Sequence, residues 1–432
     1  MTKLHFNYKD LFRAFRLGFS AKKIWVGFVG LLFGWLGYSL MGYVAYFATG
    51  TKLAAIWETF RLFPMPNAVA GIGPAAGLAW LFWLLWAVGV AWLVLVAMIS
   101  GIVISKLTYE QLRGDEFYEV KEAWKQGIKS AGALIATPIL LGLFIVLLLC
   151  AGLLLGLIGR IPYAGEIIVG VLAIPAFAVS LFIVYLAVVF VFTFSIGPAV
   201  IGTTKSDAFD NLFEVFSCVN DQPWRLIWYQ LLLGIFAVVG MAFLAFASVK
   251  ALQLGRWIVG ILMNVSAAKS SAQVLFKLDL MINGAADYVR LVLPAWLQNV
   301  LFWLPVQVQN AFGWIKETVN LPSLIHTENV VGAVGNWSVT VGTILLAITY
   351  HCLILFVLGF GSAIWYSGNT LVYLILVRKK DDRNLLEIKD EEVEIPEKLE
   401  AETPAPEAKP KRTAKAKKAP AKKPAAKKPK RG

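Results

Sequence analysis

The sequence predicts an all-α integral membrane protein with six transmembrane helices in three hairpins. Three observations support this class: 58% of the 432 residues are hydrophobic, they fall in long runs almost free of charge, and basic segments separate these runs. A membrane-spanning helix needs about 20 apolar residues to cross about 30 Å of hydrocarbon. The predicted spans are residues 24–47, 78–104, 131–158, 176–199, 226–249 and 339–365 of a membrane domain that covers residues 1–380.

The first run, residues 24–47, is too long for the core of a signal peptide and lacks a small-residue cleavage site, so a retained span is predicted. An even number of spans places both termini on one side. Basic residues gather on that side, which predicts that both termini are cytoplasmic. These residues are Lys3, Lys9, Arg13, Arg16, Lys22, Lys23, Lys106, Arg113, Lys121, Lys125, Lys129, Lys205 and Arg225, against Lys52, Arg61 and Arg160 on the other side.

An amphipathic segment precedes each odd-numbered span, and its apolar residues recur at helical spacing. Such helices lie in the headgroup layer with their aromatic side chains turned toward the hydrocarbon. The repeated unit is thus an in-plane helix followed by a membrane hairpin. The alternative is that any helix beside a membrane looks amphipathic. The three apolar stripes are Leu11, Phe15, Gly18 and Phe19; Phe117, Val120, Trp124 and Ile128; and Phe209, Leu212, Phe213 and Phe216.

An insertion at residues 254–338 separates the fifth and sixth spans. Its apolar residues come in helical periods that are interrupted by Gly284, Pro294, Pro305 and Pro322. We expect helices packed on the outer membrane surface or over the mouth of the bundle. A re-entrant hairpin at residues 291–308 is the alternative.

The C-terminal tail, residues 381–432, has no apolar mass to bury and is predicted to be disordered. It is acidic over residues 381–407 and basic over residues 408–432. The basic part holds twelve of the cations in a chain whose net charge is +13, and no acid. These cations are Lys409, Lys411, Arg412, Lys415, Lys417, Lys418, Lys422, Lys423, Lys427, Lys428, Lys430 and Arg431.

Clustered cations on an extended chain displace the counterions of a polyanion, which gives strong, sequence-independent and salt-sensitive binding. Three partners fit the tail: nucleic acid, the anionic lipid headgroups of its own membrane, and an acidic protein or the chain's own Glu-rich segment. The basic part contains no aromatic residue. Recognition of single strands by base stacking is therefore not expected.

Four glycines of the first span, Gly27, Gly30, Gly34 and Gly37, lie on one helix face. Small residues let helix backbones approach closely in lipid, where packing holds helices together. We expect this face to pack against another helix of the same chain. The alternative is a homodimer seam.

The predicted spans contain almost no ionisable residue, which disfavours substrate-coupled pumping. The exception is His351, beside Cys352, for which we expect a neutral imidazole bonded to a neighbouring helix; a metal ligand or proton carrier is the alternative. The other histidines, His5 and His326, lie far away in the sequence, and the three cysteines form no metal or redox motif. No catalytic, metal or cofactor site is therefore predicted, and the protein is not expected to be an enzyme.

Two glycine-containing segments lie near the inner ends of spans, and we expect ordinary helix ends there. They are Gly197-Pro198 in the fourth span and Ser367-Gly368-Asn369 at the end of the sixth. Local unwinding of the helices, which would let them bind a solute, is the alternative.

Short motifs resemble bacterial polytopic proteins grouped with the membrane domain of glycerophosphoryl diester phosphodiesterase. They lie within residues 107–249 and are Ile161-Pro-Tyr-Ala-Gly, Gly197-Pro-Ala-Val-Ile, Ser206-Asp-Ala-Phe-Asp and Pro223-Trp-Arg. The end of the last span, Gly368-Asn-Thr-Leu-Val-Tyr-Leu followed by Arg378-Lys-Lys-Asp-Asp, resembles uncharacterised planctomycete-type membrane proteins. The resemblance implies a six-helix protein of the bacterial cytoplasmic membrane. It transfers no catalytic residue, since the chain has no soluble phosphodiesterase domain.

The basic tail resembles the tails of linker histones and bacterial histone-like proteins, in which pairs of cations are spaced by Ala and Pro. Together these features favour a non-enzymatic membrane scaffold whose tail binds a polyanion, DNA or anionic lipid. The alternative is a channel or facilitator for a solute, regulated by the tail. A homo-oligomer is compatible with both.

Overall fold

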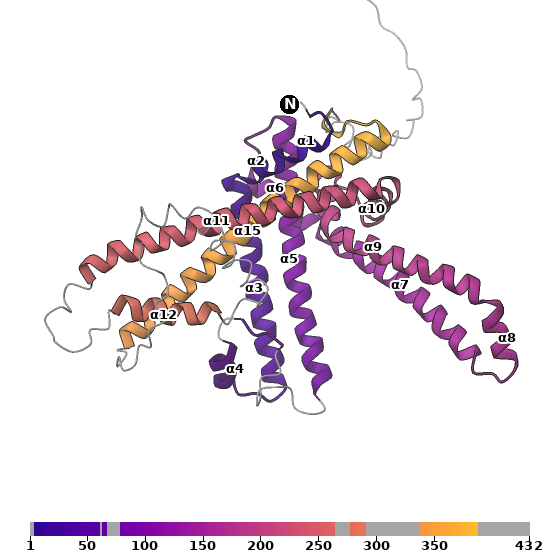
Figure 1. The fold of residues 1–432 in the computed structure, drawn as a ribbon, viewed down its shortest axis with the longest axis horizontal. Coiled ribbons are helices and arrows are strands. Elements are labelled where there is room, and N and C mark those ends of the chain that lie inside the picture. Colours follow the sequence, from indigo (N-terminus) through magenta and orange to yellow (C-terminus); the bar gives the residue numbers. More distant parts are fainter. Residues whose placement is uncertain (1–3, 61–62, 67–77, 264–276, 291–336, 388–432) are drawn as a thin grey trace, which may run out of the picture. The chain divides into compact units, whose positions relative to one another are not determined.

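The computed structural model describes residues 4–60, 63–66, 78–263, 277–290 and 337–387. Every regular element within these ranges is a helix (Figure 1). The chain divides into two units, Met1–Glu387 and Ile388–Gly432. The second unit falls outside the described residues, so the disorder predicted for it stays a prediction.

Six helices are long and apolar enough to cross a membrane. The predicted class, an all-α multi-pass membrane protein, is therefore confirmed. Each helix includes the whole of one predicted span, except that α5 begins one residue after its span does. The six are α3 (Ala21–Ala48), α5 (Ala79–Arg113), α7 (Ala131–Ile158), α9 (Ala173–Thr204), α11 (Pro223–Met263) and α15 (Trp337–Asp381).

Several of these helices run well past the predicted spans. α5 ends at Arg113 because Gly114, at φ 107°, adopts the left-handed conformation that closes a helix. α15 contains 45 residues and is about 68 Å long. That length is more than twice the hydrocarbon thickness of about 30 Å, so part of α15 extends beyond any membrane it crosses.

The three hairpins meet through their second helices. α3 packs along α5, α7 along α9, and α11 against α15 (Figure 1). α5, α9 and α15 also contact one another. Their contact regions are continuous buried stretches, residues 101–110, 196–203 and 366–377, and these form the centre of the protein core.

A short helix precedes each hairpin: α2 (Arg13–Gly18), α6 (Val120–Lys129) and α10 (Ala208–Asp221). The first of the three predicted helices is divided, because α1 (Tyr8–Leu11) precedes α2 with Phe12 between them.

The predicted apolar stripes of these helices divide between two environments. Leu11 and Gly18 are buried against the core, whereas Phe19, Phe117, Phe209 and Phe213 are exposed. Exposed aromatic rings on an in-plane helix are suited to contact with lipid.

Three further helices lie in the connections between spans: α4 (Leu53–Phe60), α8 (Ala164–Val171) and α12 (Lys277–Arg290). α12 belongs to the predicted insertion and packs on α15, where a Cβ atom at Gly284 would lie 2.8 Å from Thr343. The re-entrant hairpin considered for residues 291–308 lies outside the described residues.

The chain stays ordered beyond the predicted start of the tail at residue 381. A 3-10 helix, η2 (Leu385–Glu387), follows α15 and buries Leu386. The Tyr109 hydroxyl donates a hydrogen bond of 2.7 Å to the Leu385 carbonyl. Residues 381–387 are therefore not disordered as predicted, because η2 packs against and bonds to α5.

Candidate functional site at the junction of the hairpins

Buried charges mark the C-terminal end of α5. The Lys106 ammonium lies 2.6 Å from the Glu110 carboxylate, which also lies 3.5 Å from the Arg113 guanidinium. The spacings of three and four residues place these side chains on one helix face. Lys106 also lies over the rings of Tyr109 and Tyr118. These ion pairs neutralise the charges that α5 buries at this end of the core.

Hydroxyl and amide groups join α5, α11 and α15 in the same core. The Thr108 hydroxyl donates to the Ile104 carbonyl, so it accepts from the Ser367 hydroxyl, 2.9 Å away. The Asn369 side chain accepts a hydrogen bond from Gln230 of α11. These polar contacts specify the register of the three helices.

The first hairpin is joined to α2 by a buried lysine. The Lys23 ammonium donates to the Leu17 carbonyl at 2.9 Å and to the Gln111 side chain at 2.8 Å. Lys23 therefore bridges the α2–α3 connection and the end of α5.

α10 is held against α7 and α9 by a buried amide. The Asn211 side chain donates a 3.0 Å hydrogen bond to the Thr137 hydroxyl of α7. On α9, a Cβ atom at Gly197 would lie 3.3 Å from the Asn211 amide nitrogen. A glycine at this position therefore lets α10 pack closely on α9.

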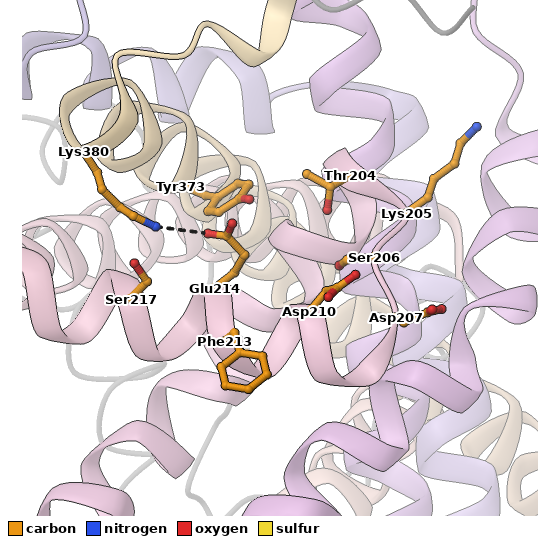
Figure 2. A pocket seen from close by; sticks show the side chains of 10 residues that line it. All are labelled: Thr204, Lys205, Ser206, Asp207, Asp210, Phe213, Glu214, Ser217, Tyr373 and Lys380. Atoms are coloured by element: carbon orange, nitrogen blue, oxygen red, sulfur yellow. Dashed lines mark ion pairs between the residues drawn. The ribbon is translucent and has the colours of Figure 1, made fainter. Parts of the chain in front are cut away.

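A polar cavity of about 560 Å³ lies between the end of α9, α10 and the end of α15 (Figure 2). Asp210, Glu214 and Ser217 line it from α10, and Tyr373 and Lys380 line it from α15. The Lys380 ammonium lies 3.9 Å from the Glu214 carboxylate, the ion pair drawn in Figure 2. The cavity presents carboxylate, ammonium and hydroxyl groups together.

The other face of α10 packs into the protein and carries Cys218. Burial, with a smaller effect of the Glu214 carboxylate, raises the pKa of the Cys218 thiol to about 12. A thiol with so high a pKa is a poor nucleophile near neutral pH. Cys218 therefore serves as an apolar core residue.

Metal-binding clusters of three or more His, Cys, Asp or Glu side chains are absent from the described residues. His351 makes its hydrogen bond to the Ala347 carbonyl of its own helix, at 2.8 Å, and stacks on Trp35 of α3. The predicted bond to a neighbouring helix is thus replaced by a bond within α15, because the neighbouring helix presents an aromatic ring.

The structure places the glycine face of α3 against two helices of the same chain. A Cβ atom at Gly27 would lie 2.6 Å from the Gly359 carbonyl of α15, and one at Gly30 would lie 2.5 Å from Ser100 of α5. Gly34 and Gly37 face Leu93 and Trp92, also of α5. This face is covered within one chain. The predicted polyanion-binding residues, Lys409 to Arg431, lie outside the described residues.

The helix ends expected at Gly197-Pro198 and Ser367-Gly368-Asn369 are wrong, and the alternative of unwound segments is not seen either. α9 is helical through Gly197 and Pro198, and α15 is helical from Ser367 through Asn369. A Cβ atom at Gly368 would overlap the Leu233 side chain of α11. Both glycines therefore serve close helix packing rather than unwinding.

The sequence analysis did not identify the cavity or the buried charges of α5. One available signal was the composition of residues 207–222, which hold Asp207, Asp210, Glu214 and Asp221 but no Lys or Arg. An acidic segment is an exception on a side predicted to be basic. A second signal was the i, i+4 spacing of Lys106 and Glu110.

Comparison of the chain with protein-family models, curated proteins and solved structures finds no match. The structure itself defines the class: a multi-pass, all-α membrane protein whose hairpins join through a largely apolar core that contains buried polar side chains.

Proposed function

We propose that this protein is a non-enzymatic membrane scaffold whose basic C-terminal tail holds a polyanion, DNA or anionic lipid, at the cytoplasmic surface of a bacterial inner membrane. The observation that carries the proposal is the tail itself, with twelve cations and no acid over residues 408–432. Such a segment binds polyanions by counterion release, without a folded binding site.

The attachment point of the tail suits a tether. The last described turn, η2, is bonded to α5 through Tyr109 and Leu385, and Leu386 is buried. α15 leads into this turn from the most buried part of the core. A force applied to the tail would therefore act on helices α5 and α15, which belong to the packed core, and not on an unanchored segment.

The distance between the anchor and the first tail cation also suits a tether. Residues 388–408 separate Glu387 from Lys409, and 21 residues reach at most about 75 Å when fully extended. The basic residues would thus sample the solution next to the membrane. The cytoplasmic location rests on the distribution of Lys and Arg between the predicted loops.

The alternative function, a channel or facilitator with a path among the three hairpins, rests on the repeat of the hairpins and on helix breaks at Gly197-Pro198 and Ser367-Gly368-Asn369. Both segments are helical. The scaffold is therefore the better-supported proposal.

Binding of the full-length protein and of a variant lacking residues 408–432 tests the proposal. Both proteins are placed in nanodiscs of neutral lipid and titrated with duplex DNA and, separately, with anionic vesicles. We expect binding that depends on the tail, and the stronger ligand identifies the polyanion. Equal binding by the two proteins, or none by either, would contradict the scaffold proposal.

A further inference from the structure

Two buried polar atoms on the lining of the α10 cavity have no hydrogen-bond partner among the described residues. They are the Ser206 hydroxyl oxygen and one carboxylate oxygen (Oε2) of Glu214; the Lys380 ammonium lies 3.9 Å from the latter, beyond hydrogen-bond distance. Tyr373 also lines the cavity, and its side chain is only 1% exposed. It points into the space between α10 and the end of α9 (Figure 2). The three side chains come from different elements and line one cavity.

A buried polar atom without a hydrogen bond is costly. Two such atoms on one cavity therefore indicate a polar ligand. The Glu214 carboxylate only accepts hydrogen bonds, whereas the Ser206 and Tyr373 hydroxyls can accept as well as donate. A group with several N–H donors can therefore bond the Ser206 and Glu214 oxygens and the Tyr373 hydroxyl at once.

The charge of the cavity favours a cation. Its lining contains three carboxylates, Asp207, Asp210 and Glu214, and two amines, Lys205 and Lys380. Lys205 points away from the other labelled side chains in Figure 2. The Lys380 ammonium forms ion pairs with two carboxylates, Glu214 at 3.9 Å and Asp381 at 3.7 Å, so it does not fully neutralise either. The carboxylates of the lining therefore keep a net negative charge that a cationic ligand can neutralise.

An exposed aromatic side chain lines the cavity beside its polar groups. Phe213 lines the cavity and is 67% exposed, and Phe209 on the same helix is 61% exposed. Exposed aromatic rings on an in-plane helix are suited to the headgroup layer. The cation is therefore best supplied by a lipid headgroup.

We propose that the α10 cavity binds a primary ammonium group carried by an aminophospholipid such as phosphatidylethanolamine. The three N–H donors of the ammonium bond Glu214, Ser206 and Tyr373, and the neighbouring phosphate lies within reach of Lys380. A quaternary ammonium, as in phosphatidylcholine, carries no N–H donor and leaves the Ser206 and Glu214 oxygens without a hydrogen bond. The proposal is independent of the basic tail.

Native mass spectrometry of the full-length protein in detergent tests this site. Short-chain phosphatidylethanolamine and phosphatidylcholine are titrated separately, and soluble phosphoethanolamine is added as a competitor. We expect phosphatidylethanolamine to bind at least about tenfold more tightly, because it makes charge-assisted hydrogen bonds that phosphatidylcholine lacks. Equal affinity for the two lipids in the wild-type protein would overturn the proposal, whatever the variants do.

Competition by soluble phosphoethanolamine at affinities similar to those of the lipid would show that the ammonium headgroup is sufficient and that the ligand need not be a lipid. Weak or absent competition would identify the membrane lipid as the source. Either result keeps the ammonium site, provided that the wild-type protein distinguishes the two lipids.

Two variants locate the site. Glu214→Gln keeps the shape of the side chain but removes its charge, and Tyr373→Phe removes one hydroxyl. Each should reduce the preference for phosphatidylethanolamine, Glu214→Gln by about tenfold. Glu122→Gln, an exposed position on α6, is the matched control and should leave the preference unchanged. An unchanged preference in a folded Glu214→Gln protein would exclude this cavity.

Discussion

The hydroxyl groups of Thr108 and Ser367 lie 2.9 Å apart and join the second helices of the first and third hairpins. Both residues are fully buried. Because α15 leads directly into the tail, this contact lies on the path between the tail and the first hairpin. It is one of several buried polar contacts that keep α5 and α15 in one arrangement.

Removal of either hydroxyl should destabilise the fold. We expect Thr108→Val and Ser367→Ala each to lower the free energy of unfolding by about 1 kcal/mol. The double variant should lose less than the sum, since the shared bond is removed only once. SDS-induced unfolding measures these changes, with Thr349→Val on the exposed part of α15 as a control. Strict additivity would contradict the bond.

Gly359 should tolerate no side chain. A Cβ atom there would lie 2.7 Å from the Phe28 backbone nitrogen, so α3 and α15 would have to separate. We expect Gly359→Ala to lower the free energy of unfolding by about 3 kcal/mol. Gly152→Ala in α7, where no atom lies within 4 Å of the added Cβ, should be neutral or stabilising by up to about 1 kcal/mol. Similar effects of the two changes would argue against the close approach.

Glu110 should be the most sensitive member of the α5 charge cluster. It pairs with both Lys106 and Arg113, so Glu110→Gln leaves the buried Lys106 without its carboxylate. We expect a loss of about 3 kcal/mol in the free energy of unfolding. Glu116→Gln, in the exposed turn after α5, should change it by less than about 0.5 kcal/mol. Comparable losses at the two positions would refute the buried pair.

The pKa of Cys218 predicts a loss of stability in alkali. Burial raises it from 9.0 in the unfolded chain to about 12 in the folded protein. The folded state therefore keeps a proton that the unfolded state loses above pH 9.0. The resulting stabilisation is complete below that pH and disappears as the pH rises toward about 12.

Unfolding of the wild type and of Cys218→Ala at pH 7.5 and pH 10.5 measures this effect, because this interval covers roughly the first half of the titration between 9.0 and about 12. The wild type should lose more stability than the variant between the two conditions. The Cys218 thiol should also resist alkylation in the folded protein and react once it unfolds. An equal loss in both proteins would exclude this role for Cys218.

Hydrophobic runs were sufficient to predict the six long helices and their pairing in hairpins. They were not sufficient to predict where the helices end. Lys106 and Glu110 end the apolar run in α5 without ending the helix, because the two side chains neutralise each other. The helix continues to Gly114, the next glycine after them, whose left-handed backbone closes it. Charge sets the limit of a membrane span, whereas helix ends depend on backbone conformation.

Glycine and proline were ambiguous for a related reason. Gly197 and Gly368 resemble helix breaks in the sequence, but in the structure they permit contacts with Asn211 and Leu233. Whether a glycine loosens a helix or lets another helix approach depends on what packs there. The α10 cavity escaped prediction for the same reason: Tyr373 reaches Glu214 only through packing of α15 on α10.

The salt dependence of polyanion binding tests the scaffold most directly. Full-length protein in neutral nanodiscs is titrated with the stronger polyanion over a series of salt concentrations, beside a variant in which Lys422, Lys423, Lys427, Lys428, Lys430 and Arg431 are replaced by Gln. We predict that log affinity falls linearly with log salt and that the slope becomes shallower by several units in the variant, toward about 0.9 for each lost contact with duplex DNA. An unchanged slope, or binding that ignores salt, would contradict the account.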